Sequence, residues 1–454
     1  MEASTDITPN VVNERQTGNN RPRRAVVAAL LSVLFMGLGQ FYNRQYVKGG
    51  LMFLLELYVL VVWSRPFMKA MWGLYTLGET VQQRVRGRVV EQGDHSIFLM
   101  IQGIIFVLLL VMFVWTYVLN VRDAFKTGQW IAEGNKPPGI GETISNIKDK
   151  GYPILLLLPA IIFTLFVTVL PLIFGILIAF TNYSSPHHLP PRNLVDWVGF
   201  KTFTDLFRLR TWSNTFYGVF TWTVIWAVAS TVTTYFIGLF YAVMINHRGV
   251  RFKKFWRALY ILPWAVPQFV SILIFRNIFN GQFGPINRFL VSLGFERIPF
   301  LTDATVAKIT LIGVNLWFGL PFWLILMTGV LTGIDKEMYE AAEVDGATPW
   351  QQFWKLTLPL VLFSTAPLLI LSFANNFNNF NMIYLFTDGG PANGNYNYAG
   401  STDILISWIY KLTLDHGQYN MASVVSILIF VLIATISIWN FRRTRAFKEE
   451  DMIQ

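Results

Sequence analysis

One stretch between two long apolar segments decides how the whole chain is interpreted. Residues 339–359 read YEAAEVDGATPWQQFWKLTLP. Asp335, just before them, is suited to cap a short helix whose apolar residues recur at helical spacing. Gly346 permits a turn, and Thr348 followed by Pro349 is typical of the start of a second helix. The stretch predicts two short helices at a water boundary. On these residues alone, a structural connector is the favoured interpretation.

The composition indicates that the rest of the chain lies in a membrane. Of 454 residues, 54% are hydrophobic and only 14% are charged, whereas soluble domains carry about 25% charged residues. The mean hydropathy is +0.45. The absence of cysteine excludes disulfides, zinc–thiolate sites and iron–sulfur clusters. A net charge of +10 fits basic cytoplasmic loops of a membrane protein better than a nucleic-acid partner.

The apolar residues gather into segments that are each close to the roughly 20 residues needed to cross a bilayer. We therefore predict an all-α polytopic membrane protein with about eight transmembrane helices. An earlier apolar stretch, residues 25–41, is predicted to form a helix at the cytoplasmic interface, although it is long enough that spanning stays open. The eight predicted spans are 48–65, 97–119, 152–180, 216–245, 257–279, 304–330, 359–385 and 421–441.

Basic residues orient these spans, because cytoplasmic loops are enriched in lysine and arginine. Arginines precede the first apolar stretch, five basic residues follow the fourth span, and three arginines open the C-terminal tail. With eight spans, all three groups fall inside, so both termini are predicted to be cytoplasmic. The loop 66–96 departs from the rule. The topology places it outside, and the sequence offers no physical account of its four basic residues, Lys69, Arg84, Arg86 and Arg88.

A polar connector at 134–150, which contains Pro137 and Pro138, separates two regions of different character. The first two spans precede it, and the other six follow it as a second unit. The predicted organisation is an accessory region 1–150 with the interfacial helix 25–41 and two spans, a six-helix core 151–445 with the loop 335–359, and a cytoplasmic tail 446–454.

The spacing in the opening stretch resembles the coupling loop of binding-protein-dependent ABC importer permeases. Glu-Ala-Ala is followed after three residues by glycine, and nine residues later by an aliphatic residue, one further residue and Leu-Pro. Several fixed positions within 20 residues, from Glu340 to Pro359, make this pattern specific. The resemblance implies that the loop docks on an ATP-hydrolysing subunit. It assigns the coupling role to Glu340, Ala341, Ala342 and Gly346, with Glu340 contacting the ATPase and Gly346 setting the turn.

The resemblance covers about residues 150–445 and is strongest to the maltose/maltodextrin (MalF-like) permease subunits. It implies a bacterial plasma-membrane location and four protein partners: a second, MalG-like permease, two ATP-binding subunits and an extracellular sugar-binding protein. One departure is the short outer loop at 181–215, where the best-known members carry a large folded domain. A surface-tethered binding protein would fit this difference. The matching stretches are 261–267, 315–321, 372–380, 385–391 and 400–403.

Four asparagines in the seventh span suggest what the membrane region binds. Amides in the bilayer are costly unless they have partners, and residues three or four apart share a helix face. Amides can donate to and accept from sugar hydroxyls, and the intervening phenylalanines suit the C–H faces of a pyranose ring. Interhelical hydrogen bonding is the alternative role for such asparagines.

By resemblance, a sugar site extends over the fifth, sixth and seventh spans. Gly319 would let a ligand approach the backbone, and Pro263 and Pro267 would interrupt the fifth span. For each aromatic residue, packing or lipid contact is the alternative. The neutral lining argues against a charged substrate. The implied site residues are Trp264, Gln268, Asn315, Phe318, Gly319, Phe322, Asn375, Asn376 and Asn379.

The sequence thus predicts a permease subunit that imports maltose or maltodextrin-type oligosaccharides by alternating access. Another di- or oligosaccharide is the first alternative. A secondary carrier and a membrane-embedded transferase are less favoured, because neither needs a coupling loop. The chain contains no Walker A sequence, so partner subunits would hydrolyse ATP. We expect no catalytic residue, metal site, cofactor or nucleic acid, and membrane lipid as a further partner.

Overall fold

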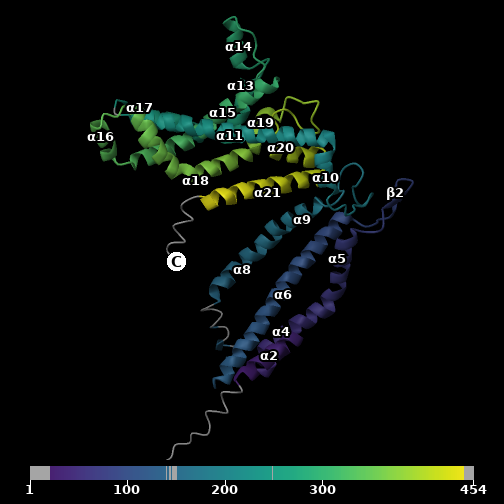
Figure 1. Cartoon of the computed structure of the whole chain (residues 1–454). Coiled ribbons are helices and arrows are strands. Elements are labelled where there is room, and N and C mark those ends of the chain that lie inside the picture. Colours follow the sequence, from purple (N-terminus) through teal and green to yellow (C-terminus); the bar gives the residue numbers. More distant parts are fainter. Residues whose placement is uncertain (1–20, 140, 143–144, 146–150, 248, 444–454) are drawn as a thin grey trace, which may run out of the picture. The chain divides into compact units, whose positions relative to one another are not determined.

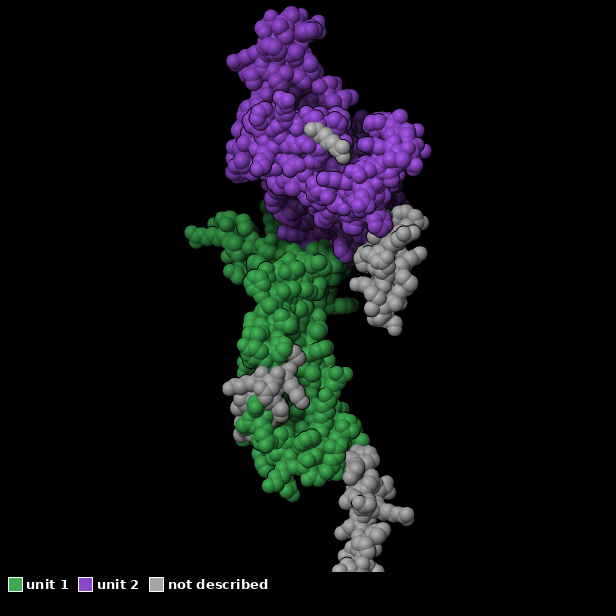
Figure 2. All heavy atoms as spheres, turned by 90° about the vertical axis from the view of Figure 1, so that its left-hand side faces the viewer, with its two compact units in different colours: residues 1–177, 187–197 green, residues 178–186, 198–454 purple. Residues whose placement is uncertain are grey.

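The computed structural model describes residues 21–139, 141–142, 145, 151–247 and 249–443 (Figure 1). These residues are largely helical, and the strands among them form one two-stranded hairpin. The chain divides into two compact units, shown in different colours in Figure 2. Unit 1 comprises residues 1–177 and 187–197, and unit 2 comprises residues 178–186 and 198–454. The predicted division at residue 150 stays a prediction, and the tail 446–454 lies outside the described residues.

Unit 1 is built on long helices because its apolar stretches satisfy backbone hydrogen bonds internally, as a bilayer requires. Its first span is one continuous helical path from Tyr46 to Thr76, its second is α6, and its third runs from Leu155 to Ile178. The helices of this region are α2 (Arg21–Leu34), α3 (Leu38–Tyr42), α4 (Tyr46–Tyr58), the π-helical turn Val59–Trp63, α5 (Ser64–Thr76), α6 (Ser96–Ala132), α8 (Tyr152–Thr164), the π-helical turn Leu165–Val169 and α9 (Leu170–Ile178).

The stretch 25–41 is not one helix, which corrects the sequence-based expectation of a single interfacial helix. α2 ends at Leu34 and α3 begins at Leu38, and Gly37 between them has a φ of 90°. A Cβ at Gly37 would lie 2.2 Å from the carbonyl oxygen of Gly49 on α4. The chain can therefore turn here only with glycine. Whether this stretch lies at the interface stays a prediction.

Buried polar groups hold the N-terminal helices together. Glu56 on α4 accepts a hydrogen bond from the backbone N–H of Met36. Gln40 on α3 donates to the carbonyl oxygen of Asn120 on α6 at 3.0 Å and to the Asp123 carboxylate at 3.2 Å. Lys48 on α4 forms an ion pair with the same carboxylate at 2.7 Å. The contacts of Glu56 and Gln40 satisfy buried groups that would otherwise be costly to bury, whereas the Lys48–Asp123 pair is partly exposed.

Unit 2 carries the elements that surround the candidate sites. Its longest helix, α11 (Arg210–Asn246), packs against α15 (Ala304–Thr332) and α18 (Leu358–Phe377). The other helices are α10 (Lys201–Arg208), α12 (Lys253–Ile261), the 3₁₀ turn Leu262–Ala265, α13 (Gln268–Ile278), α14 (Pro285–Ser292), α16 (Lys336–Val344), α17 (Pro349–Gln352), the π-helical turn Phe353–Thr357, α19 (Phe380–Thr387), α20 (Leu405–Tyr410), the π-helical turn Lys411–Asp415 and α21 (Tyr419–Arg443).

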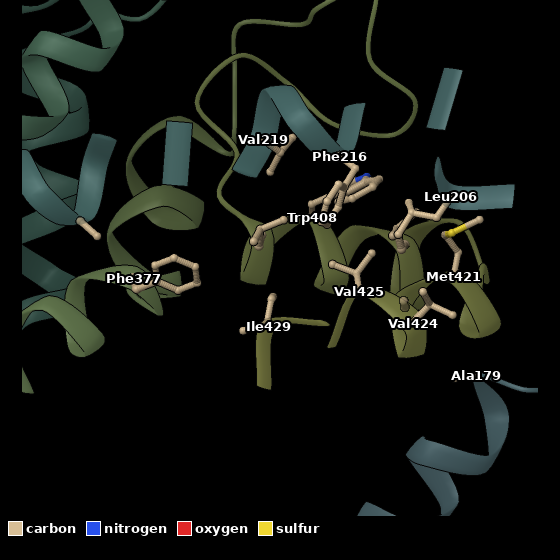
Figure 3. Close-up of a cluster of buried hydrophobic side chains, with 14 residues drawn as sticks. Ala179, Leu206, Phe216, Val219, Phe377, Trp408, Met421, Val424, Val425 and Ile429 are labelled. Carbon is tan, nitrogen blue, oxygen red and sulfur yellow. The ribbon is translucent and has the colours of Figure 1, made fainter. Parts of the chain in front are cut away.

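One hydrophobic cluster of unit 2 joins α10, α11, α20 and α21, and Figure 3 shows its side chains. Trp408 on α20 is fully buried in this cluster, and its indole N–H donates to the carbonyl oxygen of Asn397 at 3.0 Å. A second cluster joins α11 and α15 to α18, where the rings of Tyr235 and Trp323 meet edge to face with centroids 4.8 Å apart. These clusters fix the positions of the helices that carry the candidate residues.

All eight predicted spans fall on helices. Six helical segments are long and apolar enough to cross a membrane, and the bent pair α12–α13 gives a seventh. The eighth predicted span corresponds to α21, which has a shorter apolar section at Tyr419–Thr435. The predicted all-α polytopic membrane fold is confirmed.

Candidate functional site

The segment between α15 and α18 has the predicted helix–turn–helix form. The Asp335 carboxylate caps α16 by accepting a hydrogen bond from the N–H of Glu337 at 3.1 Å. Thr348 and Gln351 form a reciprocal capping box at the start of α17. Gly346 lies between the two helices with a φ of 77°. The local prediction for 335–359 is therefore confirmed.

Residues 335–359, which we call the coupling segment after their predicted role, leave large apolar side chains exposed. Val344 is 88% exposed and Trp350 is 69% exposed. The hydroxyls of Tyr339 and Thr357 lie 2.9 Å apart and tie α16 to the turn before α18. Glu340 and Ala341 are exposed, and Ala342 is half-buried. A rigid helix pair that leaves large apolar side chains in solvent is typical of a protein interaction site.

The asparagines of the seventh span lie at a break between two helices. α18 ends at Phe377 and α19 begins at Phe380. The side-chain Oδ1 of Asn379 caps α19 by accepting a hydrogen bond from the N–H of Met382 at 3.3 Å. The Asn376 side chain donates to the hydroxyl of Thr231 on α11 at 3.0 Å. An interhelical hydrogen bond thus uses one of the donor groups of the Asn376 amide.

Asn375 differs from its neighbour because its side chain is exposed. It lies on α18 one position before Asn376, so the two amides point in different directions around the helix axis. The packing of α18 against α11 therefore engages Asn376 and leaves Asn375 accessible on the surface of the chain.

The predicted residues of the sixth span all lie on α15, but they have different surroundings. Asn315 is buried, Phe318 is half-buried against Phe275 of α13 with ring centroids 6.0 Å apart, and Phe322 is 39% exposed. A Cβ at Gly319 would lie 2.5 Å from Cγ2 of Thr234 on α11. The structure therefore explains this glycine by close packing of α15 on α11.

The two prolines of the fifth span interrupt it as predicted. The segment turns through 92° between Ala265 and Gln268. Trp264 lies in the 3₁₀ turn and is 54% exposed, and Gln268 is the exposed first residue of α13. Pro267 cannot donate a backbone hydrogen bond, which favours the bend at this point. Both site candidates of this span are therefore on the surface of the chain.

The predicted sugar-site residues thus come from neighbouring helices, but they do not all share one environment. α13, α15 and α19 meet in a common hydrophobic cluster, against which Phe318 packs. Trp264, Gln268, Phe322 and Asn375 remain accessible, whereas Asn315 is buried. Their assignment as a sugar site stays a prediction. Among the described residues, no group of three or more His, Asp or Glu side chains is placed to hold a metal ion.

A buried ion pair between the loop before α20 and the π-helical turn after it went unnoticed in the sequence. The Asp403 carboxylate lies 2.9 Å from the Lys411 ammonium and is buried. It also accepts hydrogen bonds from the N–H of Gly400 and the hydroxyl of Ser407, both at 2.7 Å. Burial raises the pKa of Asp403, and Lys411 opposes that rise. The available signal in the sequence was Lys411, a basic residue eight positions after Asp403.

Gly389 packs against the same buried ion pair. Its φ is 70°, and a Cβ there would lie 2.1 Å from the Asp403 carboxylate. Lys411 also donates to the carbonyl oxygen of Asp388 at 2.7 Å. The two matching stretches that the sequence showed separately, 385–391 and 400–403, are thus joined through one buried carboxylate.

The helical core and the exposed segment 335–359 define a polytopic membrane protein with a candidate protein interaction site. Residues 234–445 match the family of binding-protein-dependent transport system inner membrane components. The chain belongs to this family, within the group of sugar-importing permeases. Such permeases have no ATPase site of their own, and separate subunits hydrolyse ATP. The protein is a multi-pass membrane protein.

Similar proteins cover almost the whole chain. The galactooligosaccharides permease GanP of Bacillus subtilis (strain 168) is 41% identical over 425 residues, which are 93% of this chain and 99% of GanP. The maltodextrin permease MdxF of the same organism is 38% identical over 456 residues, 97% of this chain and 100% of MdxF. The maltose/maltodextrin permease MalF of Escherichia coli (strain K12) is 40% identical over 252 residues, 55% of this chain and 49% of MalF.

A solved structure shares the fold. It is a bacterial ABC transporter involved in the import of the acidic polysaccharide alginate, with a TM-score of 0.54 and 24% identity. The match covers 67% of this chain and 98% of that chain. A second structure of an alginate transporter, in complex with an alginate-bound periplasmic protein, gives a TM-score of 0.52. These likenesses support the permease fold.

Proposed function

We propose that the chain imports neutral oligosaccharides, with maltodextrins as the leading substrate, through a site on α13, α15, α18 and α19. The observation that carries this proposal is the chemistry of the candidate residues. Amides and aromatic rings make up the set together with one glycine, and no ionisable side chain is among them. Amides exchange hydrogen bonds with hydroxyls, and rings pack on sugar C–H faces.

Several candidate sugar-site residues are exposed, which is expected if a second subunit completes the sugar site. Trp264, Gln268 and Asn375 lie on the surface of this chain. A second, MalG-like permease placed against that surface would exclude water from the site, which strengthens hydrogen bonds to the sugar. We assign the remaining partners as two ATP-binding subunits and an extracellular sugar-binding protein, and we place both termini in the cytoplasm.

Coupling to ATP would act through the exposed face of residues 335–359. Glu340 and the apolar side chains around Val344 would contact an ATP-binding subunit, and closure of the ATPases would move the coupling segment. Because Tyr339 is bonded to Thr357 at the start of the seventh span, that movement would pass to α18. Ligand and nucleotide would then bias one equilibrium between inward and outward states.

Galactooligosaccharides are the second candidate substrate, because GanP is 41% identical to this chain over nearly its full length. Both candidates are neutral oligosaccharides that differ in sugar configuration and linkage. Asn375 and Phe322, the exposed candidates on α18 and α15, are the residues we expect to discriminate between them.

The test is ATPase activity of the complete complex in nanodiscs, with its binding protein and a panel of sugars. Stimulation by maltose and longer maltodextrins would support the leading proposal. Stimulation by galactooligosaccharides alone would keep the mechanism and change the substrate. A complex that no sugar stimulates, although its binding protein is present and folded, would refute the proposal.

A further inference from the structure

The loop whose positive charge contradicts the topology rule forms a defined hairpin between α5 and α6. β1 (Gln83–Val85) and β2 (Arg88–Glu91) pair antiparallel, and every residue of both strands is exposed. The turn residues Arg86 and Gly87 have φ values of 51° and 81°. Two-residue turns of this kind favour asparagine, aspartate or glycine at the first position. An arginine there is strained, so the turn geometry does not explain its presence.

Three arginines crowd the tip of this arginine hairpin, residues 83–91. Arg84 lies opposite Val89, and Arg88 lies opposite Val85. Opposite residues share a face and successive residues alternate, so each face pairs one arginine with one valine. Among the described residues, none of the three arginines forms an ion pair.

The base of the hairpin is held firmly within unit 1. The Asp94 carboxylate accepts hydrogen bonds from the N–H groups of Glu79 and Thr80, each at 2.9 Å, and from the Thr80 hydroxyl at 2.8 Å. These backbone hydrogen bonds lower the pKa of Asp94. The N–H of Gln82 donates to the carbonyl oxygen of Pro191 at 3.0 Å. An exposed element that is already ordered loses little entropy when it binds a partner.

The predicted topology puts the hairpin and the coupling segment on opposite sides of the membrane. With the bent pair α12–α13 counted as one span, five candidate spans separate the two along the chain: α6, the third span, α11, that pair and α15. An odd number of crossings places them on opposite sides. If residues 335–359 meet the ATP-binding subunits, residues 83–91 face the cell exterior, where arginines oppose the usual charge bias of membrane proteins.

We propose that the arginine hairpin is a docking surface for an acidic face of the extracellular sugar-binding protein. This inference rests on the proposed function, which supplies that partner. Guanidinium groups form two-pronged hydrogen bonds with carboxylates, and the exposed valines add apolar contact between them. A lipid surface fits less well, because residues 82–91 contain none of the tryptophan or tyrosine residues that anchor segments at a membrane interface.

The test uses the complete complex in nanodiscs and measures how much binding protein half-saturates ATPase stimulation. The variant is R84Q/R86Q/R88Q, which removes charge and keeps polar side chains of similar length. At low ionic strength we expect about a tenfold rise in the half-saturating concentration, with the maximal rate unchanged, because surface charges act mainly on association. Added salt should weaken docking of the binding protein to the wild-type complex, so the half-saturating concentrations of wild type and the triple variant should become more similar.

Arg288→Gln is the matched control, since Arg288 is an exposed cation on α14 and the predicted topology puts α14 on the same side as the hairpin. It should behave as wild type. The triple variant should also keep the wild-type thermal unfolding midpoint, because no described contact is lost except the bond from Arg84 to Gln82.

Equal half-saturation for the triple variant and wild type at low salt would overturn the proposal. A defect that follows the anionic lipid content of the nanodisc and not the binding-protein concentration would also overturn it, in favour of a lipid contact. A wild-type complex that its binding protein fails to stimulate would refute the proposed function itself, and with it this inference.

Discussion

The Asp403 carboxylate and the Lys411 ammonium form a buried ion pair at 2.9 Å that closes the loop between α19 and α20. The pair also holds the backbone of both ends of that loop, through Gly400 and Asp388. Because the carboxylate is out of contact with solvent, its charge depends on these partners. These contacts tie both ends of the loop to one buried ion pair.

Lys411→Met should destabilise the protein by about 3 kcal/mol, because it leaves a buried carboxylate without its cation. The folded-state pKa of Asp403 is already raised by burial, and losing Lys411 raises it further. A raised carboxyl pKa favours folding at low pH and is increasingly unfavourable as pH rises. The loss of unfolding free energy in Lys411→Met relative to wild type should thus become smaller as the pH falls.

Thermal unfolding of the detergent-solubilised protein between pH 5 and pH 8 measures this effect. Asp403→Asn/Lys411→Met, which removes both charges, should recover part of the loss. A deficit of the same size at every pH would show that the charge of Asp403 does not carry the effect.

Gly319→Ala should destabilise unit 2 by about 1–3 kcal/mol, because the added Cβ would lie 2.5 Å from Cγ2 of Thr234 and push α15 from α11. The control is Gly313→Ala on the same helix, where a Cβ meets nothing within 4 Å. Thr234→Ala should restore part of the stability in the double variant. Equal effects at positions 313 and 319 would contradict close packing as the reason for this glycine.

Gly346→Ala should uncouple transport while leaving the fold intact. The residue has a φ of 77°, but no atom lies within 4 Å of an added Cβ, so the change strains only the turn, by about 1–2 kcal/mol. We expect sugar-stimulated ATPase activity to fall at least severalfold with normal membrane insertion. Gly333→Ala is the control, because Gly333 lies nearby and has a φ of −84°, and it should retain activity. An equal loss of activity in the Gly333 variant would contradict strain in the Gly346 turn as the cause.

Glu340→Ala should likewise lower sugar-stimulated ATPase activity, by about tenfold, because we propose that its exposed carboxylate contacts an ATP-binding subunit. Co-purification of the ATPase subunits with the variant measures whether docking is lost. Glu343→Ala, an exposed acid on the same helix, is the comparison. Full activity of the Glu340 variant would remove it from the coupling surface.

Asn375→Ala and Asn376→Ala should have different signatures. Asn376 is bonded to Thr231, so its loss should cost about 1 kcal/mol of stability, and Thr231→Val should cost a similar amount. Asn375 is exposed, so its loss should leave stability unchanged and raise the sugar concentration needed for uptake. Uptake that is unaffected by Asn375→Ala would remove this residue from the sugar site.

Much of the fold could be predicted because its signals are local. The apolar stretches are long enough to require helices in a bilayer. Asp335 and Thr348 mark helix starts by the hydrogen bonds their side chains make within three residues. The bend at Pro263 and Pro267 follows from proline geometry. Each of these predictions depends only on residues that are close together in the sequence.

The surroundings of the candidate site could not be predicted in the same way. The prediction that Gly319 lets a ligand approach the backbone stays a prediction, and only the fold shows that this glycine also lets α15 pack closely on Thr234 of α11. Asn375 and Asn376 are the same residue type in the same span, yet the packing of α11 engages only one of them.

By itself, the sequence predicted the spans and the helix–turn–helix form of 335–359, because hydropathy and capping act over short distances along the chain, and its resemblance to known permeases indicated the class of protein. Only the tertiary structure decided that 25–41 breaks at Gly37, that Asp403 pairs with Lys411 and that the arginines of 83–91 stand on a hairpin. The carbonyl oxygen of Gly49 and the ammonium of Lys411 come close only when the chain folds, so their effects have no signature in the local sequence.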